Sequence, residues 1–421
     1  MKRGMRAFND RFLASLQYRD FRYLWTANAF AQAAAWALIV TRGWLVFEET
    51  ESAALVGATT FAAMAPQFIV PPIVGVLADR IDRWTSLVWS YAFMLSHTLV
   101  RLGRALLGWL VVWMWISLSV VNGVARAGQL PTSQALSATL VPKEKLLNAL
   151  SLQASTQHGS RMIGPGIVTP VLSIFGAAAA FLACTLFYGL GLLQVLRIEK
   201  RPVPVSASRE GFFANLLGGF AYVYSQPTLR FMVVLVFFHC GLTMAFESLL
   251  PTFSDERLTS RPEGFGTLMM GVGAGAFVAS IFVSGITTVR ARGNVLVLTG
   301  LASGLGQVAL GFTGTLWMAT VAAAVMGGAQ AAFMTMGQSI TQSTATDEFR
   351  GRVASINTLS LGGVMAVMNL ANGSLDATFG AATLLKVEGL IFALIMLGSL
   401  VGLQGRRIYG RGPGLGAAAV P

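Results

Sequence analysis

A charged turn between two apolar stretches reads GVLADRIDR, from Gly75 to Arg83. The apolar stretch before it ends near Ala78, and Asp79, Arg80 and Arg83 then follow within a few residues. A turn this short is no flexible linker. We expect it to hold two membrane helices together at the water boundary.

The composition requires an apolar environment. Of the 421 residues, 54% are hydrophobic and only 11% are charged, whereas a soluble domain carries about 25% charged residues. Apolar runs of roughly 20 residues, the length that crosses a bilayer, recur along the chain. We predict about twelve membrane helices with little mass outside the membrane, over residues 23–47, 53–77, 84–103, 106–128, 153–174, 177–196, 229–250, 264–287, 294–311, 315–337, 353–374 and 381–402.

The formal net charge of +12 reflects topology. The N-terminal segment and every second loop hold most of the 30 Lys and Arg residues, while the opposite loops hold only Arg101, Arg104, Arg257, Arg261 and Lys386. This bias predicts that both termini are cytoplasmic and that the basic loops face the inner leaflet of a bacterial inner membrane. We therefore expect no nucleic-acid partner.

Other chemistry finds little support in the sequence. Cys184 and Cys240 fall in apolar spans, which predicts free thiols. The three histidines lie on different spans without metal-ligand spacing, so each is read as a packed side chain and we expect no metal or other cofactor. Residues 271–275, GVGAG, lack the lysine of a nucleotide-binding loop and predict a helix-packing face. The first apolar span is too long for the core of a cleavable signal peptide.

The chain divides into two halves around a polar stretch that starts at Arg197. We predict six-helix bundles over residues 1–197 and 229–421 and a cytoplasmic linker over 198–228, with an amphipathic surface helix near 211–224. A shift of 204 positions matches Gln134 with Gln338 and Glu144 with Glu348, in register with the loops. Parallel repeats of this kind are typical of transporters.

Several motifs resemble the major facilitator superfamily. The turn at 75–83 is similar to its G-x-L-x-D-R-x-x-R signature between the second and third helices. Four further stretches resemble the drug/proton antiporter branch of macrolide efflux pumps and enterobactin exporters: DFRYLW at 20–25, WLVFE at 44–48, RMIGP at 161–165 and DEFRGRV at 347–353. The resemblance implies two pseudo-symmetric six-helix bundles, a substrate site near mid-membrane and alternating access.

The same resemblance implies that the turn with Gly75, Asp79, Arg80 and Arg83 is a gating latch on the inner side. A simple topogenic turn is the alternative, since short cytoplasmic loops are basic in general. The second half keeps basic loops without the complete motif, at Arg290, Arg292, Asp347, Arg350 and Arg352.

Gly164 and Pro165 resemble the Gly-Pro element of antiporter motifs, but Val168-Thr169-Pro170 stands where further glycines are expected. A helix kink and close helix packing therefore remain an alternative to a role in coupling.

Five ionisable residues lie inside predicted spans, where such groups are costly and usually functional. Glu247 and Glu388 are the candidates for proton coupling, and Arg42, Arg126 and Arg161 for the substrate cavity. Arg42 and Glu247 differ by nearly the repeat offset, which suggests a pair at an outer gate; separate contacts with the membrane surface are the alternative. Unneutralised arginines in the cavity would favour an anionic or zwitterionic substrate.

These observations predict a secondary transporter and not an enzyme. We expect a monomer in the lipid bilayer that exports a small amphiphilic molecule, a drug-like compound or a siderophore, in exchange for protons. A lipid or lysolipid flippase of the same fold is the alternative, and a membrane sensor without transport activity is a weaker one, because the loops are too short for a sensor domain.

Overall fold

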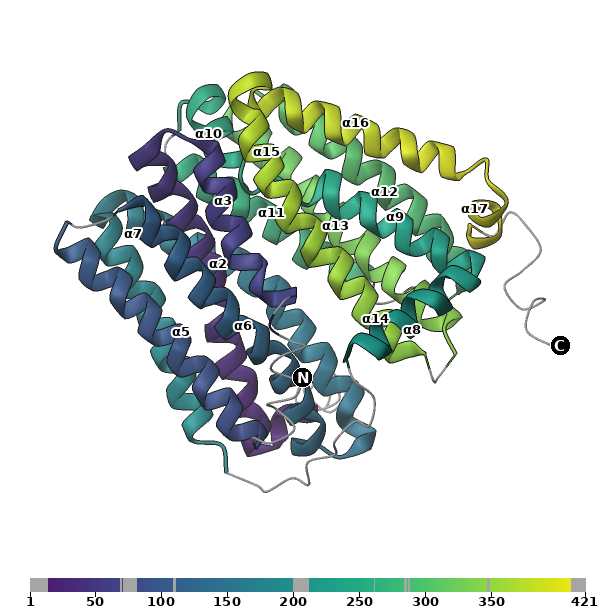
Figure 1. Ribbon diagram of the computed structural model, residues 1–421, viewed down its shortest axis with the longest axis horizontal. Coiled ribbons are helices and arrows are strands. Elements are labelled where there is room, and N and C mark those ends of the chain that lie inside the picture. Colours follow the sequence, from purple (N-terminus) through teal and green to yellow (C-terminus); the bar gives the residue numbers. More distant parts are fainter. Residues whose placement is uncertain are drawn as a thin grey trace, which may run out of the picture. The chain divides into compact units, whose positions relative to one another are not determined.

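Helices make up nearly all of the structure (Figure 1). The computed structural model describes residues 14–68, 70, 82–108, 111–199, 212–260, 262–283, 286, 288–346 and 349–409. No β-strand occurs within these ranges. The prediction of an all-α protein is confirmed.

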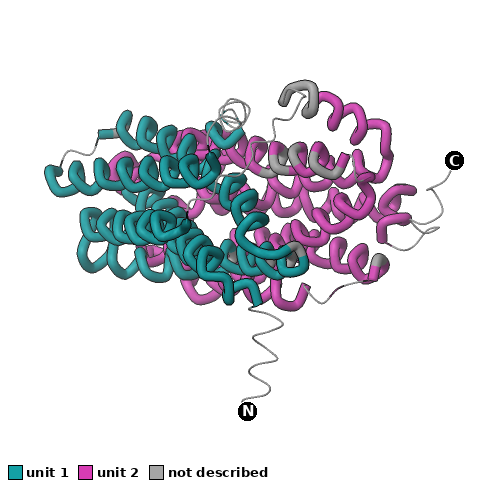
Figure 2. Tube along the Cα trace, turned by 90° about the horizontal axis from the view of Figure 1, so that it is seen from below, with its two compact units in different colours: residues 1–45, 65–208 teal, residues 46–64, 209–421 magenta. Residues whose placement is uncertain are grey.

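The chain forms two compact units, residues 1–45 with 65–208 and residues 46–64 with 209–421 (Figure 2). The second unit thus takes in the helix that follows the first span. The two units are described separately below.

The described residues of unit 1 form four long helices and two short 3-10 turns. The long helices are α2 (Arg19–Thr50, whose last residues belong to unit 2), α5 (Arg83–Leu106), α6 (Val112–Leu140) and α7 (Leu146–Leu196). The turns are η1 (Ala14–Gln17) and η2 (Lys143–Lys145). Two predicted spans meet within α7 at Gly176, whose φ of 78° interrupts the helix. Only glycine adopts such a φ readily, because it has no Cβ.

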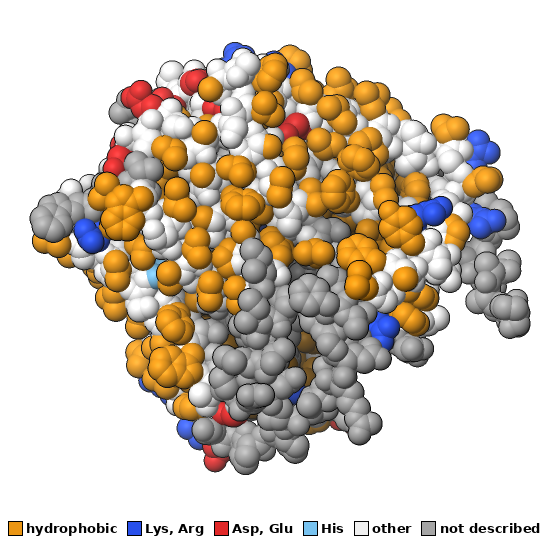
Figure 3. Space-filling view, viewed as in Figure 1, with side chains coloured by type: hydrophobic (Ala, Val, Ile, Leu, Met, Phe, Trp, Pro, Cys, Tyr) orange, Lys and Arg blue, Asp and Glu red, His pale blue; other side chains and the backbone are white. Residues whose placement is uncertain are grey.

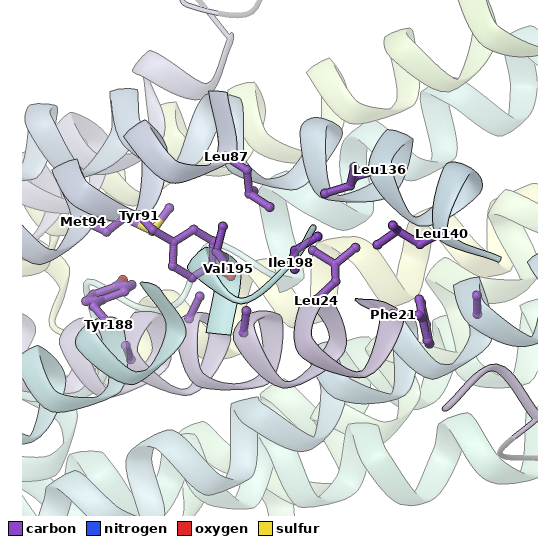
Figure 4. Packing of buried hydrophobic residues seen from close by; sticks show 14 of the residues in the cluster. Phe21, Leu24, Leu87, Tyr91, Met94, Leu136, Leu140, Tyr188, Val195 and Ile198 are labelled. Carbon is purple, nitrogen blue, oxygen red and sulfur yellow. The ribbon is translucent and has the colours of Figure 1, made fainter. Parts of the chain in front are cut away.

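The core of unit 1 lies between α2, α5, α6 and α7 (Figure 4). Its fully buried side chains include Phe21 and Leu24 of α2, Leu87 and Tyr91 of α5, and Tyr188 of α7. Burial on these faces fixes the helices around α2, which carries the polar residues discussed below.

Unit 2 contains eleven described α-helical pieces and one π-helical turn. They are α3 (Ala53–Met64), α8 (Phe212–Ser225), α9 (Pro227–Thr243), α10 (Leu250–Leu258), α11 (Pro262–Val283), α12 (Val289–Phe312), α13 (Leu316–Thr344), α14 (Arg350–Leu359), the π turn η3 (Ser360–Val364), α15 (Met365–Phe379), α16 (Ala381–Ser399) and α17 (Leu403–Ile408). The span predicted over 353–374 is therefore three consecutive pieces.

Small residues set the closest helix contacts of unit 2. A Cβ on Gly57 of α3 would lie 2.5 Å from the carbonyl oxygen of Asn369 in α15. In the GVGAG stretch, Gly275 of α11 faces the Ala324 carbonyl of α13 so closely that an added Cβ would overlap it. The prediction that this stretch is a packing face is confirmed.

A helix is present where the sequence predicts one near 211–224: it is α8, which packs against α14. Its place at the membrane surface stays a prediction. Tyr222 of α8 stacks on Phe349 with ring centroids 4.1 Å apart. The axis turns by 112° between residues 217–225 and α9. The turn separates α8 from the span that follows it.

Among the described residues, six helices are long and apolar enough to cross a membrane, and a seventh is added if the bent pair α8–α9 counts as one span. The outer faces of the described helices are apolar as well: Trp89, Phe175, Phe282, Phe312 and Trp317 are all more than half exposed. Hydrophobic side chains dominate the face in Figure 3. An exposed apolar surface of this extent fits contact with lipid rather than water.

Candidate functional site

The charged turn is described only at its last two residues. Asp82 caps the N-terminus of α5, where its carboxylate accepts from the backbone N–H groups of Trp84 and Thr85 at 3.3 and 3.2 Å. Arg83 donates through Nη1 to the Ala135 carbonyl of α6 at 3.2 Å. Gly75, Asp79 and Arg80 lie outside the described residues. Asp82 therefore supplies the helix cap at the end of this turn.

A polar stripe runs along one face of α2 through Asn28, Gln32 and Trp36, each four residues from the next. The Oδ1 of Asn28 accepts from Gln129 Nε2 of α6 at 2.9 Å and from the Tyr91 hydroxyl of α5 at 3.2 Å. Asn28 is buried, so this network joins three helices through one amide.

Arg126 and Arg161 both meet this stripe. Arg126 of α6 donates through Nη2 to Gln32 Oε1 at 3.4 Å. The guanidinium carbon of Arg161 in α7 lies 4.7 Å from the centroid of the Trp36 ring, within the range of a cation–π contact. The two candidate substrate arginines thus approach neighbouring turns of α2 from two helices.

Gly164 gives α7 its close approach to α2. A Cβ at this position would lie 2.5 Å from the Ala33 carbonyl oxygen and 2.9 Å from the Ala37 nitrogen. Pro165 follows inside α7, and non-helical φ/ψ values in α7 occur only at Gly176. The packing contribution of this Gly-Pro element is evident, and a role in coupling stays a prediction.

Unit 1 also buries two arginines near the C-terminal ends of α2 and α5. Arg42 is 2% exposed and Arg101 is fully buried. Placing Arg101 in an outer loop was therefore wrong: it lies within α5 and faces inward, because the helix continues to Leu106.

In unit 2 the span predicted over 229–250 is broken. Helix α9 ends at Thr243 and α10 begins at Leu250, and residues 244–249 between them are not helical. The last carbonyls of a helix have no partner within it. Inside a membrane such groups must be paired by protein, since lipid offers no donors.

Four side-chain amides from three helices pair this broken backbone. Gln307 of α12 donates to the Leu242 carbonyl at 2.9 Å, and Gln330 of α13 donates to the Thr243 carbonyl. Asn372 of α15 donates to the Ala245 carbonyl at 2.9 Å, while Asn369 accepts from the Ser248 N–H at 3.0 Å. All four amides are fully buried. We call Gln307, Gln330, Asn369 and Asn372 the amide clamp.

Glu388 of α16 lies beside the amide clamp. Its Oε2 is 3.5 Å from Gln307 Nε2, and its exposed fraction is 6%. Gln307 therefore connects the Leu242 carbonyl at the end of α9 with a buried carboxyl group. A change in the charge of Glu388 can therefore affect the broken helix through the side chain of Gln307 alone.

Glu247, the other candidate for proton coupling, lies in the break itself and is 3% exposed. It belongs to unit 2, whereas Arg42 belongs to unit 1. The outer-gate pair of Arg42 with Glu247 stays a prediction.

The remaining candidates lie at the ends of helices. Arg290 is exposed at the start of α12, two residues before the half-buried Arg292. Arg352 of α14 places its guanidinium 5.1 Å from the centroid of the Phe349 ring and packs against the glycines of α8. Asp347 and the side chain of Arg350 lie outside the described residues.

Ionisable residues within the spans do not reveal the amide clamp or Asn28. A search for Asn and Gln in apolar segments would have found all five, since these side chains also need partners inside a membrane. His239 was read as a packed side chain, which is confirmed: its ring stacks on Phe333 at 4.1 Å, and Nε2 lies 3.3 Å from Ser303 Oγ.

Known transporters share both sequence and fold with this chain. It is 21% identical to the staphyloferrin A transporter of Staphylococcus aureus over 69% of this chain and 73% of that protein. It is 23% identical to the multidrug efflux pump Tap of Mycolicibacterium fortuitum (76% and 80%) and 20% identical to macrolide efflux protein A of Streptococcus pyogenes (80% and 84%).

Solved structures give the same result for the fold. A POT family transporter in complex with 5-aminolevulinic acid aligns with a TM-score of 0.69 at 14% identity, over 91% of this chain and 96% of that one. The nucleoside transporter NupG aligns with a TM-score of 0.70 at 14% identity, over 90% and 96%. The transmembrane secretion effector family of the major facilitator superfamily matches residues 11–406. The chain belongs to this family of membrane transporters, and it is not an enzyme.

Proposed function

We propose that the protein is a proton-coupled exporter of small amphiphilic molecules in which Glu388 carries the coupling proton. The observation behind the proposal is the contact of this buried carboxyl with Gln307, which also holds the carbonyl at the end of α9. Glu247, within the break of the same helix, is the second candidate.

The proposed coupling follows from hydrogen-bond chemistry. An ionised carboxylate only accepts hydrogen bonds, whereas a protonated carboxyl also donates one. Gln307 Nε2 donates to both Glu388 and the Leu242 carbonyl. Protonation of Glu388 removes its negative charge and so weakens the hydrogen bond that it accepts from Gln307. The bond from Gln307 to the Leu242 carbonyl is then favoured over the bond to Glu388. Broken helices of this kind line the ion and substrate sites of other transporter folds. The protonation state of Glu388 would thus select between two arrangements of the segment from α9 to α10.

The substrate class is proposed from the relatives and from unit 1. Relatives of the chain are a staphyloferrin A transporter, a multidrug efflux pump and a macrolide efflux protein. Arg161 lies over the Trp36 ring, and Arg126 contacts Gln32 one turn away on α2, so together they offer cationic and aromatic contacts to an amphiphile with a negative group. We propose a drug-like compound or a siderophore of this type.

The proposed organisation is a monomer with two six-helix bundles, residues 1–197 and 229–421, in a bacterial inner membrane with both termini cytoplasmic. Alternating access would use the turn with Asp79 as its inner latch. Asp79→Asn should then lower transport more than Arg290→Gln does, because only the first half has the complete motif. Equal losses would leave the turn a topological anchor.

Inside-out vesicles test the function directly. Uptake of labelled macrolides, siderophores, dyes and lysolipids is compared with and without an inward-acidic proton gradient, against vesicles without the protein. Gradient-dependent uptake of a dye, drug or siderophore supports the proposal. Lysolipid movement alone would establish a flippase, and uptake that ignores the gradient would refute proton coupling.

A further inference from the structure

The guanidinium of Arg101 is fully buried in unit 1 and makes few of its possible hydrogen bonds. Its Nη2 donates to the Ser119 hydroxyl of α6 at 3.3 Å. Its Nε and Nη1 have no hydrogen-bond partner among the described residues. An arginine stays charged at any pH that the protein meets, so two donors of a full positive charge are left open in an apolar interior.

One aromatic ring lies next to this charge and packs against another. The guanidinium carbon of Arg101 is 5.5 Å from the centroid of the Trp115 ring, and Trp115 lies 6.0 Å from Phe181 of α7. On the same face of α5, the His97 ring lies 6.0 Å from the ring of Tyr188. The buried Tyr188 hydroxyl also has no hydrogen-bond partner among the described residues.

In the part of the chain that the structure describes, no carboxylate neutralises Arg101. The titratable groups that act on it electrostatically are Arg42, Cys184 and Tyr188, and Arg42 adds a second positive charge. Cys184 is a buried free thiol. A buried charge without a counter-ion is among the most expensive features that a protein can have, and a nearby like charge increases the cost.

We propose that Arg101 and the Tyr188 hydroxyl form a binding site for a small monovalent anion, either chloride or a carboxylate group. The planar guanidinium presents its N–H groups in a fork that suits both ligands. Tyr188 adds a neutral donor, and the Trp115 ring beside the guanidinium favours a small group. The site lies in unit 1, whereas Glu388 lies in unit 2. A test of the anion site is therefore independent of the proposed proton coupling.

Thermal unfolding of the purified full-length protein tests the site, because a ligand that binds only the folded state raises the melting temperature. Sodium chloride, sodium acetate and the sodium salt of HEPES, a bulky sulfonate, are titrated at matched ionic strength. Chloride or acetate should raise the melting temperature with saturation, and HEPES should not. Saturation by chloride identifies a free halide, and saturation by acetate alone identifies a carboxylate such as one carried by the transported compound. Equal curves for all three salts would overturn the proposal.

Two variants and one matched control locate the effect. Arg101→Gln should abolish the saturable rise, while Arg104→Gln, which removes the same charge one turn further along α5, should preserve it. Tyr188→Phe keeps the ring and removes only the open hydroxyl, so it tests the site even if Arg101→Gln does not fold. Loss of one hydrogen bond to a charged ligand should increase the half-saturating concentration by about tenfold. An unchanged half-saturating concentration in Tyr188→Phe, or a preserved rise in Arg101→Gln, would refute the assignment.

Discussion

Replacing Gln307 by Leu tests whether the amide clamp holds the broken helix. Leucine has a similar volume but no donor, so the substitution leaves the Leu242 carbonyl without the bond that it accepts at 2.9 Å. It also removes the amide that lies 3.5 Å from Glu388 Oε2. Because Gln307 is fully buried, water cannot replace either contact.

The expected loss follows from these contacts. A buried carbonyl that loses its donor costs about 1–3 kcal/mol. Leucine regains little of this in a membrane protein, since the lipid is as apolar as the protein interior. For a unit of roughly 200 residues, 1 kcal/mol shifts the melting temperature by about 2–4 °C. Gln307→Leu should therefore lower the melting temperature by about 2–12 °C.

Thr299→Val is the matched control in the same helix. Thr299 bonds only to carbonyls of its own helix, Val295 and Leu296, so its loss should change the melting temperature by about 2 °C or less. Both variants are measured in one detergent by intrinsic fluorescence on heating. If Gln307→Leu melts within 1–2 °C of the unaltered protein, the Leu242 carbonyl has another partner and the clamp is not needed.

Two pairs of substitutions, one pair in each unit, test the packing by the same melting assay. Gly275→Ala should lower the melting temperature by several degrees, because overpacking costs about 1–3 kcal/mol and the Ala324 carbonyl cannot move away alone. Gly398→Ala is the control, because an added Cβ there meets nothing within 4 Å. It should leave the melting temperature equal or higher, since alanine favours helix over glycine by about 1 kcal/mol. A higher melting temperature in both variants would exclude the close approach of α11 to α13. Asn28→Leu should destabilise the protein more than Tyr91→Phe does, because Tyr91→Phe removes only one of the hydrogen bonds that Asn28 makes. Equal losses of stability would show that Asn28 does not join the three helices through several hydrogen bonds.

Most of the fold could be predicted from hydropathy alone. Apolar runs of bilayer length identify helices whatever their packing, and described helix lies in each predicted span. The break after Thr243 could not be found in this way, because residues 244–249 remain apolar enough to continue a span. Unwinding there depends on amides that are distant in sequence, such as Gln307 and Asn372.

The candidate site was predictable only in part. Ionisable residues stand out in apolar spans, and a search for them finds Glu388 and Arg126. Their partners are amides, which hydropathy treats as mild interruptions. Arg101 was misplaced because its position near the end of a predicted span suggested a loop, whereas α5 continues to Leu106 and buries it.

Glu388→Gln measured in two transport modes tests the central claim of proton coupling through this carboxyl. Glutamine keeps the size and a hydrogen-bonding oxygen but cannot take up and release a proton. In proteoliposomes the variant should retain substrate exchange at equal concentrations on both sides, which needs no net proton movement. It should lose accumulation driven by a proton gradient. Gradient-driven accumulation at the rate of the unaltered protein would contradict the account.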